Sequence, residues 1–84
     1  RDVRRSRGLG DVYKRQIDQL QATLENDTEY LAAYYQLGQC FELKKDFDKA
    51  IVAYQNGVPI ARSQNNTKTL SELNQAIMLL EDED

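Results

Sequence analysis

Aromatic and small residues recur at helical spacing in the middle of this 84-residue chain, and this pattern constrains the fold more than any other feature. Intervals of three and four place each set on one face of a helix. Small residues let two helix backbones approach closely, and aromatic rings fill the spaces beside them. We therefore predict two antiparallel helices that pack through these faces. The residues concerned are Tyr34, Leu37, Gly38 and Phe41 in the first helix, and Phe47, Ala50, Tyr54 and Gly57 in the second.

The pattern resembles the tetratricopeptide repeat, a helix–turn–helix unit of about 34 residues. When Leu37 and Gly38 are set on the family's Leu-Gly pair, Tyr34 and Phe41 fall on two of its aromatic positions. The family's next Tyr, Ala, aromatic and small-residue positions are then taken by Phe47, Ala50, Tyr54 and Gly57. The resemblance implies an all-α fold of antiparallel helix–turn–helix repeats, a fragment of an α-solenoid with about four helices.

The chain divides into a basic segment and an acidic helical domain. Residues 1–16 carry six basic and two acidic side chains, whereas residues 17–84 carry five basic and twelve acidic ones. The first segment resembles translated adapter sequence, so we expect it to be non-native and leave it out of functional reasoning. A disordered basic tail or a nucleic-acid arm are the alternatives.

Residues 17–84 are predicted to form one tetratricopeptide-like domain. The register predicts the second helix of a partial repeat over residues 17–26, a full repeat over 28–61 and a capping helix over 66–81. The core stripe of the capping helix is predicted to be Leu70, Leu73, Ile77 and Leu80. Its polar outer face is predicted to be Lys68, Ser71, Asn74, Gln75 and Glu81.

Capping and helix-breaking residues predict where the helices of the full repeat begin and end. Asp27 and Asp46 are expected to cap its two helices. Asn66 or Thr67 is expected to cap the last helix, and a capping box of Thr69 and Glu72 is the alternative. Pro59 is expected to kink the second helix of the repeat or to stop it near the preceding residue, because proline lacks an N–H and its ring presses on the preceding turn. The inner face of that helix is predicted to be Phe47, Ala50, Ile51, Tyr54 and Val58.

The composition of the chain argues against catalysis and metal binding. The chain has no histidine, which is the commonest general base and metal ligand. Its single cysteine, Cys40, is predicted to be a small buried residue, and Gly38 and Gly57 are isolated within helices and form no phosphate-binding loop. We therefore expect no enzyme activity, no cofactor and no metal.

A binding face is predicted on the first helix of the full repeat. The resemblance implies a concave groove that receives peptides or partner helices, lined by Ala32, Tyr35, Gln36, Gln39 and Glu42. Ala32, Tyr35 and Gln39 also share one helical face by their spacing alone. The alternative is that Tyr35 only covers the neighbouring half-repeat. Family members that hold a terminal carboxylate use Lys and Asn on this face, so that function does not carry over to Tyr35 and Gln39.

These observations predict an interaction module that binds a peptide or partner protein on the concave face. The alternative is a structural cap or self-association unit of a longer array, with a possible homo-oligomer. We expect no nucleic-acid partner, and no membrane partner because no apolar run reaches the roughly 20 residues that span a bilayer. A single cysteine is compatible with a cytoplasmic location.

Overall fold

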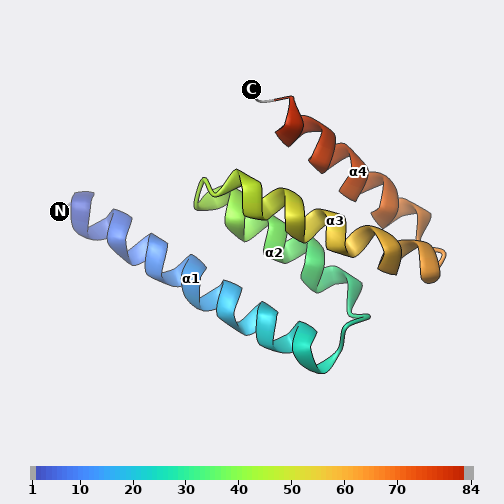
Figure 1. Cartoon of the computed structure of the whole chain (residues 1–84). Coiled ribbons are helices and arrows are strands. Elements are labelled where there is room, and N and C mark those ends of the chain that lie inside the picture. The colour runs from blue at the N-terminus through green and yellow to red at the C-terminus, as the bar shows by residue number, and fades with distance from the viewer. Residues whose placement is uncertain (1, 83–84) are drawn as a thin grey trace.

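The computed structural model consists of four α-helices joined by short turns (Figure 1). It describes the backbone of residues 2–82 and the side chains of residues 11–82. Successive helices run antiparallel, and no strand occurs in the described range, so the predicted all-α helical repeat fold is confirmed. The helices are α1 (Asp2–Asn26), α2 (Leu31–Leu43), α3 (Phe47–Ser63) and α4 (Thr67–Glu81).

Helix α3 forms the centre of the packing, with α2 and α4 both packed against it. Tyr54 of α3 and Leu73 of α4 are the largest fully buried side chains. Leu73 and Leu80 are buried, and Leu70 and Ile77 pack against the same cluster, as predicted for the stripe of α4. The core therefore spans all four helices through Ile17, Leu31, Leu37, Cys40, Phe41, Ala50, Ala53, Tyr54, Ala61, Leu73 and Leu80.

Two glycines allow α2 and α3 to approach each other, each opposite a tyrosine of the facing helix. A Cβ atom at Gly38 would lie 2.6 Å from Cδ1 of Tyr54, which is closer than van der Waals contact with the ring allows. A Cβ atom at Gly57 would lie 2.9 Å from Cβ of Tyr34 and 3.2 Å from Cδ1 of Leu73. Real Cβ atoms essentially never come within 3.0 Å of such neighbours, so a side chain at Gly38 or Gly57 would force the facing tyrosine to shift.

Two aromatic residues are less buried than the sequence pattern predicts. Phe47 is 42% exposed, so its prediction as an inner-face residue is wrong. It is the first residue of α3, where the helix has just left the turn and lacks a full turn of neighbours on its N-terminal side. Tyr34 is only half-buried, because its hydroxyl extends to the rim and donates a hydrogen bond to the carbonyl of Thr28 at 2.7 Å.

Helix starts match the predictions in part. Asp27 does not cap α2: the cap position is Tyr30, and the Asp27 carboxylate instead accepts the N–H of Glu29 at 3.1 Å within the turn. Asp46 occupies the cap position of α3, but its side chain makes no capping hydrogen bond. Its carboxylate lies 3.7 Å from the Lys49 ammonium, and this outward ion pair replaces the expected cap. Asn66 caps α4 as predicted, accepting the N–H of Thr69 at 3.1 Å.

Helix α3 continues through Pro59 to Ser63, so of the two outcomes predicted for Pro59 the stop near Val58 is wrong, and the kink stays a prediction. Pro59 is exposed, and its ring therefore displaces no core side chain. Gly57 and Ala61, on either side of it, are both buried against neighbouring helices. Packing on both sides of the proline offsets the roughly 3 kcal/mol that an interior proline costs a helix.

Helix α1 begins at Asp2, earlier than the residue 17 expected for the first helix, and runs without interruption to Asn26. Gly8 and Gly10 each disfavour a helix by about 1 kcal/mol, but this stretch has no proline and many good helix formers. The adapter origin of residues 1–16 stays a prediction. Over the described residues, no helix is both long and apolar enough to cross a membrane.

The α2–α3 and α3–α4 turns share one backbone geometry. Each contains one residue with positive φ, Lys45 at 63° and Asn65 at 56°. In each turn the following N–H bonds back to a carbonyl of the preceding helix, from Asp46 to Phe41 at 2.8 Å and from Asn66 to Ala61 at 2.9 Å. Such left-handed residues commonly end helices and reverse the chain.

Candidate functional site

Two grooves flank α2, one on each side. The α2–α4 groove has a volume of about 390 Å³ and is lined by Tyr35, Gln39, Glu42, Tyr54, Glu72, Gln75, Ala76, Leu79 and Leu80. The α1–α2 groove has a volume of about 600 Å³ and is lined by Gln16, Gln19, Leu20, Thr23, Tyr30, Gln36, Gln39, Cys40 and Leu43. Both volumes would accommodate a few side chains of a partner, and Gln39 contributes to both grooves.

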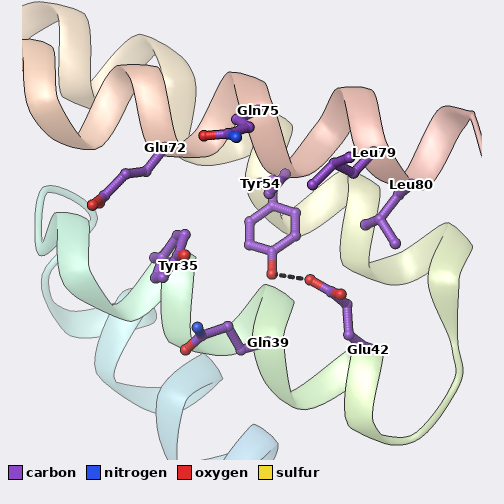
Figure 2. Close-up of a pocket in the computed structure, with 9 residues that line it drawn as sticks. Tyr35, Gln39, Glu42, Tyr54, Glu72, Gln75, Leu79 and Leu80 are labelled. Carbon is purple, nitrogen blue, oxygen red and sulfur yellow. Dashed lines mark hydrogen bonds between the residues drawn. The ribbon is translucent and has the colours of Figure 1, made fainter.

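The Tyr54 ring separates the two walls of the α2–α4 groove (Figure 2). Gly38 leaves room for this ring on α2, so the same close approach that packs the core also positions the groove. The Tyr54 hydroxyl donates a hydrogen bond to the Glu42 carboxylate on α2. The Tyr35 ring lies 5.7 Å from the Tyr54 ring between centroids, tilted by 45°. Tilted aromatic pairs of this kind are favourable, and this one joins α2 to α3 beneath the groove.

The Tyr54 hydroxyl remains a hydrogen-bond donor over the neutral range. Burial raises the pKa of Tyr54 above its ordinary value, and the hydrogen bond to Glu42 and the charge of that carboxylate raise it further. The hydroxyl therefore stays protonated and donates to the carboxylate. This interaction fixes one carboxylate oxygen, Oε2, in the groove wall.

The α4 wall of this groove was not predicted as a site. Glu72, Gln75 and Leu79 lie there at intervals of three and four, so they share one helical face. Gln75 was predicted only as a solvated outer residue, and Leu79 is 62% exposed although it is large and apolar. The signal in the sequence that could have identified this wall is Leu79 itself, a large apolar residue that lies outside the predicted core stripe.

The α1–α2 groove differs in that its lining carries no charged side chain. Cys40, at its base, is buried and lies with its thiol 3.6 Å from the Gln16 amide oxygen. Burial raises the pKa of the Cys40 thiol, so the sulfur stays protonated. A protonated, buried thiol is a poor nucleophile.

The five residues predicted for the binding face are divided between the two grooves and the exposed surface of α2. Tyr35, Gln39 and Glu42 line the α2–α4 groove together, whereas Gln36 lines the α1–α2 groove. Ala32 is exposed on α2 and lines neither groove. Among the side chains described, no group of three or more His, Cys, Asp or Glu residues could hold a metal ion.

Comparison with known proteins gives matches at the level of structure. No protein-family model and no curated protein matches this sequence. The solution NMR structure of a tetratricopeptide repeat domain protein from Salinibacter ruber is similar, with a TM-score of 0.82 and 32% identity over 88% of this chain and 75% of that chain. A crystal structure of the tetratricopeptide repeat domain protein from the same organism gives a TM-score of 0.80 and 32% identity, over 88% of this chain and 82% of that one.

Proposed function

The chain belongs to the tetratricopeptide repeat family, and on this premise we propose that it binds a peptide or a partner protein in the α2–α4 groove, without catalysis. The observation that carries the proposal is the make-up of that groove. Two helices supply opposing walls of mixed apolar and polar side chains, and the buried Tyr54 ring lies between them. Apolar surface with a few fixed polar groups is the usual composition of a recognition site.

Tyr35, Gln39 and Glu42 are the α2 residues that we propose as ligand contacts. Glu72, Gln75 and Leu79 are their counterparts on α4. Gln39 and Gln75 present amides that both donate and accept hydrogen bonds, which suits the peptide groups of a partner backbone. Ala32 and Gln36 lie outside this groove, and we assign them no direct contact there.

The absence of catalysis and of nucleic-acid binding is part of the proposal. The chain contains no histidine, and the protonated state of Cys40 argues against a nucleophilic role. The two carboxylates in the α2–α4 groove oppose the approach of phosphate groups. A protein segment is the ligand class that fits both features.

A peptide-display selection tests this function. Random peptides selected on the full chain are expected to lose binding to Gln39→Ala and to Leu79→Ser, because both side chains are exposed in the groove. Ser71→Ala, also exposed on α4 but outside the groove, is the matched control. Tyr35 is avoided because its ring packs on Tyr54, so its removal would mix stability with binding. Selected peptides that bind all three variants equally would contradict the groove assignment.

Self-association is the second candidate function, favoured by a specific feature of α4. Met78 and Leu79 are adjacent and 59% and 62% exposed, which leaves a small apolar surface near the end of the helix. Sedimentation velocity of the full chain and of Met78→Gln distinguishes the two functions. A dimer that Met78→Gln dissociates would favour self-association, and a concentration-independent monomer would exclude it.

A further inference from the structure

We propose that the α2–α4 groove selects a basic peptide segment, in which cationic side chains flank an apolar one. This inference rests on the proposed function, because it concerns the ligand of the same groove. It is carried by charge complementarity together with the aromatic surface beside the carboxylates.

The charge in the groove has one sign. Its lining contains two carboxylates, Glu42 and Glu72, and no lysine or arginine. Lys44 and Lys68, the basic residues closest in sequence to its two walls, are exposed and do not line it. A cleft with charge of one sign and low-dielectric walls raises the local concentration of ligands of the opposite sign.

The two carboxylates lie at opposite ends of the groove, with the tyrosine rings between them (Figure 2). Glu42 uses Oε2 to accept the Tyr54 hydroxyl, and no described residue gives Oε1 a hydrogen bond. Oε1 is therefore available to a ligand, while the Tyr54 bond holds the carboxylate in place. A carboxylate held in this way loses less side-chain entropy when it meets a cation than a freely rotating one does.

The aromatic surface favours the same class of ligand. Tyr35 is half-buried, and its ring lines the groove beside Gln39. A guanidinium or ammonium group is attracted to the face of such a ring, and arginine also stacks on it. Tyr35 thus adds a cation-binding surface that does not depend on the carboxylates.

The apolar part of the lining, at the Glu42 end of the groove, accounts for the apolar residue of the segment (Figure 2). Ala76, Leu79 and Leu80 form an apolar stretch on α4, and Leu79 is the most exposed of the large hydrophobic residues described. A leucine-sized side chain of the ligand would cover Leu79 and remove apolar area from water. The segment we infer therefore contains arginine, an apolar residue and a second arginine.

Titration with blocked synthetic octapeptides tests this inference. The first peptide carries two arginines that flank a leucine, and the second and third carry glutamine or glutamate in place of the arginines. Binding to the full chain is measured by ¹H–¹⁵N NMR, following the amides of Gln39 and Leu79. The arginine peptide is expected to bind, and raising the salt concentration from about 20 mM to about 150 mM is expected to weaken its binding.

Charge-neutralising variants localise the effect. Glu72→Gln is expected to weaken binding of the arginine peptide about two- to fivefold, the range of an exposed ion pair. Glu42→Gln is expected to weaken binding by a similar factor. The amide oxygen can still accept the hydrogen bond from the Tyr54 hydroxyl, so the variant removes the charge and keeps the packing. Glu25→Gln removes the same charge from an exposed position of α1 outside either groove, and it should leave binding unchanged.

Three other results would contradict the basic selectivity, the proposed function or the identity of the ligand. Equal binding of the glutamine peptide at Gln39 and Leu79 would refute the basic selectivity but leave the proposed function intact. If no peptide, neutral or charged, shifts these amides and display selections also yield no groove ligand, both fail. If sedimentation shows a dimer that Glu72→Gln dissociates, the occupant of the groove is a second copy of the chain, and the peptide inference is wrong.

Discussion

The two grooves share a wall and even a residue, Gln39, yet they differ in what lies beneath them. Under the α2–α4 groove, Tyr54 of a third helix is buried against Gly38 and hydrogen-bonded to Glu42. The lining of the α1–α2 groove comes from α1, α2 and the turn between them, with no third helix and no charged side chain. The smaller groove thus has a buried side chain of a third helix between its walls, whereas the larger one is an uncharged surface between two helices. A binding site gains from the first arrangement because preorganised groups lose less entropy on binding.

Gly38→Ala is expected to have the largest effect on the packing beneath the α2–α4 groove. The added Cβ would overlap the Tyr54 ring, and overpacking of this kind costs about 1–3 kcal/mol. Alanine recovers up to about 1 kcal/mol of helix propensity, so the expected net loss is roughly 1–2 kcal/mol. Chemical denaturation measures it, with Asn56→Ala on the exposed side of α3 as a control that should be neutral or slightly stabilising. Unchanged stability in Gly38→Ala would show that Tyr54 does not depend on that glycine.

Alkaline pH tests the same tyrosine without mutation. The folded-state pKa of Tyr54 is raised above the ordinary value of about 10, so its contribution to stability is complete below pH 10. As pH rises from about 10 toward the folded-state pKa, the unfolded chain loses a proton that the folded chain keeps. Stability then falls by at most about 1.4 kcal/mol per pH unit. Denaturation at stepped pH should show this slope in the wild type and a smaller slope in Tyr54→Phe.

Tyr54→Phe at neutral pH is expected to have a smaller effect. It keeps the ring in place but removes the hydroxyl that Glu42 accepts, which costs about 0.5–1.5 kcal/mol. Equilibrium unfolding in urea measures this loss. The matched variant is Tyr30→Phe, which removes a hydroxyl from a half-exposed ring of the α1–α2 groove. Equal losses in the two variants would contradict the distinction between the grooves.

Gln16→Ala changes the lining of the α1–α2 groove and is expected to have the smallest effect of these variants. Gln16 is exposed, and its described hydrogen bond is the weak one from the Cys40 thiol at 3.6 Å. Its removal is expected to change the free energy of unfolding by less than about 0.5 kcal/mol. The reaction of Cys40 with an aromatic disulfide reagent should remain slow, because the thiol is buried on α2. Rapid modification in Gln16→Ala would show that the Gln16 side chain shields this cysteine.

The fold was largely readable from the sequence, because the positions that carry it are spaced periodically. Tyr54, Gly38 and Gly57 interlock as the offsets predict, and Asn66 caps α4 through a local hydrogen bond. The errors have different physical causes. Pro59 stays helical because the flanking residues are buried, and Phe47 is exposed by its place at a helix start.

The site was less predictable than the fold. Tyr35, Gln39 and Glu42 were identified on α2, but the α4 wall with Glu72 and Leu79 was not. A periodic pattern reports which face of a helix is apolar, and it does not report which polar residues of two helices will face each other. The Tyr54–Glu42 hydrogen bond likewise joins residues from different helices, and nothing in their local sequence requires it.

The paired turns have a consequence for how a chain like this can vary. Lys45 and Asn65 have the same left-handed backbone, although one is a long cation and the other a short amide. The two turns therefore share a backbone conformation but not a residue type. Asparagine tolerates that state readily and lysine less so, so Lys45 holds a conformation that its own side chain does not favour. Substitutions at these two positions are therefore restricted by backbone geometry more than by side-chain chemistry.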